Sequence, residues 1–218
     1  YYDNSQRSLE RILRSLLAGG ERAEEAWLRI LPSWLRQKLH LPELIRRELR
    51  FTGPLFKNLH HRSHAASAFF PSPFHRAAVL TVDGVGEWAT ATIGIGSDNR
   101  LTLLKEMHFP NSLGLLYAAL TQFLGFKVNE DEYKVMGLAP YGDPTFVSTI
   151  LDKLVDLKDD GSIMLNMEFF SFLTEPSMIN EKFGGLFDGP PRTPDARLTR
   201  RDINVARSIQ AVIEESIL

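Results

Sequence analysis

Leucine and isoleucine recur at helical spacing near the start of the chain. Leu9, Ile12 and Leu16 would lie on one face of a helix. Gly19-Gly20 is expected to end this helix, because glycine favours the position just after a helix C-terminus. The pattern therefore predicts an amphipathic helix that begins near Ser8.

Further helices are predicted over residues 21–31, from Pro32 and from Pro42, since proline suits the first turn of a helix. Arginine and lysine are frequent here, which is typical of a solvated helix face. The alternative is a helical insertion that shapes a ligand pocket. Both interpretations divide the chain into a helical subdomain, residues 1–58, and a second domain, residues 59–218.

The hydrophobic pattern changes after this helical region. The apolar run 77–82 is typical of a buried strand, residues 89–95 mix threonine with apolar residues, and residues 101–109 supply a third strand. Residues 96–99 (GSDN) are expected to form the second turn. The three segments predict an antiparallel meander with a glycine turn after its first strand.

Helical patterning returns in the second half of the chain. Asn111-Ser112 is expected to cap a helix that Gly125 ends, and Asp143-Pro144 to open a helix that runs to Leu154. The remaining elements are a short strand over residues 162–165, a long loop over 175–195 and a final helix over 198–218. This order of elements predicts an α/β fold.

The composition is that of an ordinary globular protein, with 44% hydrophobic and 24% charged residues among 218. The net charge of −2 gives no indication of nucleic acid or a membrane surface as partner. The absence of cysteine excludes a disulfide scaffold, a thiolate metal site and a cysteine nucleophile. No apolar run approaches a membrane span and no signal peptide is evident, so a cytoplasmic location is expected. Without an initiator methionine, the chain is expected to be part of a longer protein.

His60 and His64 are four positions apart, so both imidazoles would point the same way on a helix and could share one ion. Histidine pairs at this spacing are often structural. Here Asp83 follows the predicted first strand and can supply an oxygen ligand. Such an N,N,O set suits a divalent transition ion such as Fe²⁺, Mn²⁺ or Zn²⁺. His61 would lie about 100° away around the helix, where it would contact a substrate or simply be exposed.

The turn Asp83-Gly84-Val85-Gly86-Glu87 follows the predicted buried strand. Such turns are common as plain hairpin connections. An aspartate at the end of a buried strand is costly unless it binds something, so Asp83 is expected to orient a metal ion or a metal-bound water. Gly84, Val85 and Gly86 would let backbone N–H groups approach phosphate oxygens. Glu87 would belong to the same cofactor site or would fix the turn by packing.

Residues 125–142 combine glycine, charged and aromatic residues without a clear period, as loops that line binding sites often do. Lys127 and Lys134 could bind phosphate as cations, and Gly137 belongs to the same candidate cofactor site. The alternative is an ordinary surface loop with ion pairs. The backbone at Ser112 and Gly114 is a further candidate anion site, although a plain N-cap explains it as well.

Four ordered segments closely resemble the O-carbamoyltransferases of the nodulation and antibiotic-biosynthesis type. They are residues 60–69 (HHRSHAASAF), 83–88 (DGVGEW), 112–117 (SLGLLY) and 132–142 (EYKVMGLAPYG). The resemblance covers most of the chain. It implies part of an actin-like ATPase domain (ASKHA, ribonuclease H-like), with the three-strand meander and a helical N-terminal insertion. The first strand and the C-terminal half of that domain would lie outside residues 1–218.

The same resemblance implies an activity. Such enzymes combine carbamoyl phosphate with ATP to form carbamoyl-adenylate, in a separate and more C-terminal domain, and pass the carbamoyl group to a hydroxyl of a small molecule or sugar. His60 and His64 would be metal ligands, most simply for iron, and Asp83 would lie at the metal or assist the acceptor hydroxyl. The expected partners are the hydroxylated acceptor, whose pocket the N-terminal helices would shape, and the rest of the same chain.

The mechanism expected from these residues is carbamoyl transfer in which a metal ion polarises the carbamoyl carbonyl. Asp83 or His61 would act as general base for the acceptor hydroxyl. Two other classes stay open: a sugar-kinase-like phosphotransferase, which would bind Mg²⁺ through carboxylates and water, and a non-catalytic binding module. The chain by itself is not expected to be active.

Overall fold

The structure, a computed structural model, describes residues 4–218 apart from the side chain of Arg22, and it divides into two compact units. The first unit extends to Phe109 and includes residues 173–175, whereas the second comprises residues 110–172 and 176–218. The predicted boundary after residue 58 lies inside the first unit. The assignment of residues 1–58 as an insertion therefore stays a prediction.

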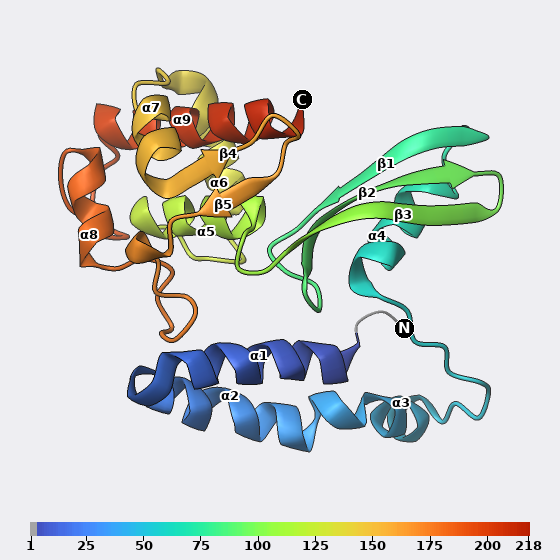
Figure 1. The fold of residues 1–218 in the computed structure, drawn as a ribbon. Helices are drawn as coiled ribbons and strands as arrows, with labels where there is room; N and C mark the ends of the chain where they lie inside the picture. The colour runs from blue at the N-terminus through green and yellow to red at the C-terminus, as the bar shows by residue number, and fades with distance from the viewer. Residues whose placement is uncertain (1–3) are drawn as a thin grey trace. The chain divides into compact units, whose positions relative to one another are not determined.

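Three helices open the first unit: α1 (Ser5–Gly19), α2 (Glu24–Arg36) and α3 (Leu41–Leu49), with short 3-10 turns η1 (Gly20–Ala23) and η2 (Lys38–His40) between them. The predicted end of α1 is confirmed, because Gly20 follows it with φ of +58°. A small apolar core joins α1 and α2, which run side by side (Figure 1).

The prediction that a helix opens at Pro32 is wrong, because Pro32 lies inside α2. Only one more turn follows this proline, and it is closed by the Gln37 N–H donating to the Ser33 carbonyl. Because proline has no backbone N–H, it removes one backbone hydrogen bond from the helix. The helix predicted at Pro42 is confirmed as α3, with proline in its first turn.

The rest of the first unit is a helix on a sheet. Helix α4 (His60–Phe69) precedes strands β1 (Arg76–Val82), β2 (Ala89–Ser97) and β3 (Arg100–His108), and the predicted antiparallel meander β1-β2-β3 is confirmed. Figure 1 shows α4 against one face of this sheet, where Ala65 and Phe69 pack on Val79. An added Cβ at Gly96 would lie 2.4 Å from Phe69 Cδ2, so glycine allows this close packing.

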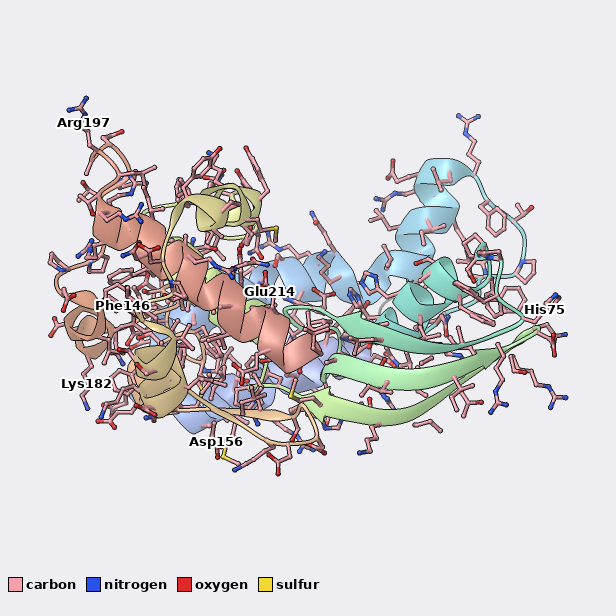
Figure 2. All side chains as sticks on the ribbon, turned by 90° about the horizontal axis from the view of Figure 1, so that it is seen from above. His75, Phe146, Asp156, Lys182, Arg197 and Glu214 are labelled. Carbon is pink, nitrogen blue, oxygen red and sulfur yellow. The ribbon has the colours of Figure 1, made fainter. Side chains whose placement is uncertain are left out.

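The far end of the sheet is closed by His75 and Asp98. Figure 2 labels His75 at this end, where its carbonyl accepts the Asp98 N–H at 2.7 Å. Asp98 has φ of +51°, a conformation that aspartate tolerates better than most residues. The turn after β2 is therefore tied to the segment before β1.

The second unit contains mainly short elements. They are α5 (Leu113–Phe123), α6 (Glu132–Leu138), η3 (Ala139–Tyr141), α7 (Val147–Thr149) continued by the π-helix η4 (Ile150–Leu154), β4 (Val155–Leu157), β5 (Ile163–Leu165), η5 (Met167–Phe169), α8 (Glu181–Gly184), η6 (Gly185–Phe187) and α9 (Arg200–Ile217). Across residues 4–218, none of the helices has both the length and the apolar character that crossing a membrane requires.

Local signals located the ends of α5 and α9 correctly. The Ser112 hydroxyl accepts the Leu115 N–H, and Gly125 follows α5 with φ of +72°. Thr199 and Asp202 form a reciprocal capping box at the start of α9. The caps of α5 were predicted from residues close in sequence, whereas the capping box of α9 was not named, although the final helix was predicted to within two residues at its start.

Three predictions in this unit are wrong. The helix expected from Asp143-Pro144 begins only at Val147, because the N–H groups of Asp143 and Phe146 donate to Asn204 and Ser208 of α9. Residues 125–142 contain α6, which buries Val135, and are not one continuous loop. Residues 175–195 likewise contain α8 and η6. For residues 143–146, tertiary contacts with α9 decide the local structure.

Phenylalanine rings fill the middle of the second unit. Phe123, Phe183 and Phe187 are completely buried, and their ring centroids lie 5.0–5.8 Å apart. Phe146, labelled in Figure 2, meets the ring of Phe187 edge-on at 5.5 Å. Such tilted contacts are the favoured arrangement of aromatic pairs.

Candidate metal centre

The side chains of His60, His64 and Asp83 meet at the start of α4. His60 Nε2 lies 2.6 Å from Asp83 Oδ2, and His64 Nε2 lies 3.0 Å from His60 Nε2 and 3.3 Å from Asp83 Oδ2. The helix brings the two imidazoles to one face, and β1 ends where its following aspartate can join them. The predicted ligand atoms therefore converge in space.

Two of the three separations fit a shared ion, whereas the 2.6 Å between His60 Nε2 and Asp83 Oδ2 is the length of a direct hydrogen bond. Two ligand atoms at about 2.1 Å from one metal lie roughly 3.0–3.4 Å apart at octahedral or tetrahedral angles. Two imidazole nitrogens and one carboxylate oxygen form a donor set that suits Fe²⁺, Mn²⁺ or Zn²⁺. The His64 side chain is 54% exposed and that of Asp83 36%, so a ligand can reach the cluster from solvent.

Asp83 is held as a carboxylate. Burial raises its pKa, but the hydrogen bonds from His60 and from the Gly84 N–H outweigh burial and leave the pKa below its ordinary value. The two oxygens have different partners, since Oδ1 accepts the Gly84 N–H at 2.6 Å while Oδ2 faces the histidines. A carboxylate oriented in this way is prepared for a cation.

Glu87 holds the N-terminus of α4. Its carboxylate accepts the His60 N–H, with both oxygens at 3.2 Å, and the Asn4 N–H at 2.7 Å, and the residue is only 4% exposed. Leu59 at the N-cap position offers no side-chain acceptor, so Glu87 supplies one from the β1–β2 turn. Neither role considered for Glu87, in a cofactor site or in packing of the turn, includes this capping of α4, and both stay predictions.

The glycines of the turn approach the helix closely. An added Cβ at Gly86 would lie 2.9 Å from His60 Cβ and 3.1 Å from His61 Cδ2. The Gly84 N–H donates to Asp83 Oδ1, and the Gly86 N–H donates to the Ala89 carbonyl at 2.9 Å. Because both groups have protein acceptors, a phosphate site at Gly84, Val85 and Gly86 stays a prediction.

His61 is buried, with 2% of its surface exposed, and the interpretation that it is simply exposed is wrong. Its Nε2 lies 2.8 Å from the Ala89 carbonyl, which can only accept, so this nitrogen carries the proton. Nδ1 lies 2.7 Å from the Thr81 hydroxyl, which also contacts Thr92. Burial lowers the pKa of His61, only partly opposed by the bond to Ala89, which favours the neutral imidazole.

The bonds of His61 join α4 to both β1 and β2. A residue with both ring nitrogens occupied by protein partners is well suited to hold the helix in register. Its spacing in the sequence gives no signal of this role. The threonines at positions 81 and 92, which would face inward in alternating strands, are the sequence feature that indicates polar partners here.

The other predicted cofactor residues belong to the second unit. Lys134 of α6 pairs with Asp131 at 2.8 Å, and its pKa is raised mainly by that hydrogen bond. Lys127 pairs with Glu130, so both lysines form the surface ion pairs of the alternative interpretation. Gly137 is exposed on α6. A phosphate role for Lys134 and Gly137 stays a prediction.

Comparison with known proteins places the chain among transferases. The family described as carbamoyltransferase N-terminus matches residues 19–218, and the chain belongs to this family. The resemblance to carbamoyltransferases of the nodulation type is thereby confirmed.

Individual relatives agree with this assignment. The chain is 48% identical to the uncharacterized protein sll1178 of Synechocystis sp., over all of this chain and 37% of that protein. It is 40% identical to nodulation protein NolNO of Sinorhizobium fredii and 38% identical to nodulation protein NolO of Bradyrhizobium diazoefficiens, over about half of this chain. The chain spans 37%, 16% and 20% of these three relatives, respectively.

Proposed function

We propose that this chain is part of an O-carbamoyltransferase that passes a carbamoyl group to a hydroxyl of a small molecule or sugar. Family membership supports the reaction class. The observation that carries the proposal is the convergence of His60, His64 and Asp83. The co-substrates in this proposal are carbamoyl phosphate and ATP, joined as carbamoyl-adenylate elsewhere in the protein.

The fold proposed for the whole domain is actin-like, of the ASKHA class. The antiparallel meander β1-β2-β3 followed by helices supports this proposal. Residues outside positions 1–218 would supply the rest of that domain. A cytoplasmic location is part of the same proposal.

His60 Nε2, His64 Nε2 and Asp83 Oδ2 would hold a divalent ion, with Fe²⁺ as the first candidate. When bound, such an ion supplies a Lewis acid that stabilises negative charge on the carbamoyl carbonyl oxygen. The cluster is partly exposed, so an acceptor hydroxyl can approach it. These residues therefore provide both a place for the carbamoyl group and access for its acceptor.

Asp83 is the better placed general base. It is ionised and lies at the surface of the cluster, so it can accept the proton of the acceptor hydroxyl. His61 would have to lose its bond to Thr81 or Ala89 before it could do the same. We assign His61 to positioning α4, and with it the two imidazoles.

The test uses the full-length protein and compares His64→Ala with His75→Ala. His75 is an exposed histidine of the same unit and lies at the far end of the sheet. We expect His64→Ala to lose bound metal and to lower carbamoyl transfer by about a hundredfold, and His75→Ala to change neither. Metal content is measured by elemental analysis and the product by mass spectrometry.

Two results would contradict the proposal. His64→Ala with full metal content and near-normal transfer would remove the ligand assignment. A phosphorylated acceptor in place of a carbamoylated one would support the sugar-kinase-like alternative.

A further inference from the structure

A cavity of about 400 Å³ lies beside the metal cluster, within the first unit. Its walls come from α1, the first turn of α4, the segment after the β1–β2 turn, and β3. The three candidate metal ligands are outside its described lining, whereas His61 and Glu87 belong to it. The volume falls in the range of small-ligand sites.

Hydrogen bonds hold these walls together. The Glu87 carboxylate binds backbone N–H groups of Asn4 and His60, and the Glu87 carbonyl accepts from Arg11 Nε at 2.6 Å. The Arg14 guanidinium lies 5.6 Å from the centre of the Trp88 ring. Helix α1 is therefore tied to the turn, so the cavity is formed before a ligand arrives, which reduces the entropic cost of binding.

The acidic side chains of the lining are already engaged. Glu10 pairs with Arg14 at 2.7 Å, and the Glu87 carboxylate is occupied by the backbone. Glu106 lies 3.6 Å from His108. None of these three carboxylates forms an ion pair with the remaining cations of the lining.

Two of those cations are Arg7 and Arg62, which enter the lining from α1 and α4. Within residues 4–218, neither guanidinium forms an ion pair. Guanidinium groups bind carboxylates and phosphates through paired hydrogen bonds. Trp88 adds an aromatic surface, which suits the C–H face of a sugar-like ring.

We propose that this cavity binds a small ligand that carries a carboxylate or phosphate on a hydroxylated ring. Arg7 and Arg62 bind the anionic group, and Trp88 contacts the ring. The candidate metal ligands are not part of the lining, so the proposal does not depend on carbamoyl transfer or on a bound metal ion.

The experiment is calorimetric titration of the full chain with glucose 6-phosphate, glucuronic acid and glucose. A chelator is present throughout, so that no metal ion contributes to phosphate binding. The wild type is compared with the double variant Arg7→Gln/Arg62→Gln. The matched control is Arg36→Gln/Arg47→Gln, which removes the same charge from exposed positions of the same unit. Circular dichroism verifies that both variants fold.

We expect at least one acidic sugar to bind about tenfold or more tightly than glucose. The Arg7→Gln/Arg62→Gln variant should lose most of that preference, whereas the control should stay within about twofold of the wild type. Tighter binding of glucose 6-phosphate identifies phosphate as the anionic group, and tighter binding of glucuronic acid identifies carboxylate. Equal binding of glucose and the acids, no binding of either acid, or an equal loss in the control would overturn the proposal. None of these results depends on carbamoyl transfer.

Discussion

The two units differ in what fills their interiors. In the second unit the rings of Phe123, Phe183 and Phe187 meet one another. In the first unit, the space between α4 and the sheet contains His61 and Thr81, joined by hydrogen bonds. Among the described residues, no fully buried side-chain nitrogen or oxygen lacks a partner. The first unit thus places a hydrogen-bonded polar group beside the apolar contacts of α4 with the sheet, whereas aromatic rings meet in the middle of the second unit.

The difference shows what each interior contributes. Apolar burial stabilises a fold strongly but is not directional. Hydrogen bonds contribute less net free energy, yet they fix distance and orientation. The candidate metal centre needs atoms placed to within a few tenths of an ångström, and it lies beside the hydrogen-bonded interface between α4 and the sheet.

The largest expected effect tests the apolar interior. Phe187→Ala should lower the free energy of unfolding by about 3–5 kcal/mol, because it leaves a cavity among packed rings. Urea unfolding measures this loss, and metal affinity of the folded fraction should not change. Met164→Ala, at a side chain that is 57% exposed, is the control and should cost less than about 1 kcal/mol. A small loss for Phe187→Ala would remove the contrast between the units.

The second prediction tests the polar interior. Gly86→Ala places a Cβ against His60 and His61, so α4 must move. We expect a loss of about 1–3 kcal/mol in stability and about a tenfold loss in metal affinity, measured by thermal unfolding and metal titration. Gly185→Ala is the control, since an added Cβ there meets no atom within 4 Å. Unchanged metal affinity in Gly86→Ala would show that the turn does not set the ligand geometry.

The third prediction concerns the capping box of α9 in the second unit. Asp202→Asn should cost about 1 kcal/mol at neutral pH, because Asp202 accepts from the Thr199 N–H and pairs with Arg201. Burial raises the pKa of Asp202, but its hydrogen bonds with Thr199 and Arg201 outweigh this and lower the pKa overall.

The sign of the pH dependence follows from that lowered pKa. The stabilisation by Asp202 is complete above its unfolded value of 3.8 and is lost as the pH falls through the lower folded value. Denaturant unfolding between pH 7 and pH 2 should therefore show wild type and Asp202→Asn converging at the acid end. A constant difference across this range would mean that the charge of Asp202 is not what stabilises α9.

The smallest expected effect on stability concerns Lys134. Its ion pair with Asp131 is exposed, so Lys134→Gln should change the free energy of unfolding by less than about 0.5 kcal/mol. If Lys134 binds phosphate, the same variant of the full-length protein should bind carbamoyl phosphate or ATP about tenfold more weakly. Lys158→Gln, in another exposed ion pair of the second unit, is the control. Equal ligand affinity in both variants would leave Lys134 as a surface residue.

Sequence reasoning predicted much of the candidate site because its main signals are local. The spacing of His60 and His64 determines that they share a helix face, and a strand that ends before Asp83 presents its carboxylate at that end. It missed the role of Glu87, which holds a helix that begins 27 positions earlier in the chain. The sequence offers one sign of such a distant partner. Leu59, at the N-cap position of this helix, has no side-chain oxygen that could accept a backbone N–H.

The sequence by itself therefore determined the elements whose ends have their own caps, the order of the meander and the pairing of two imidazoles. Only the tertiary structure decided that His61 faces inward and that Asp143 and Phe146 bond to α9 instead of starting a helix. The physical reason is the range of the interactions. Caps and helical spacing act within about one turn, whereas the partners of buried polar groups come from segments that meet only when the chain has folded.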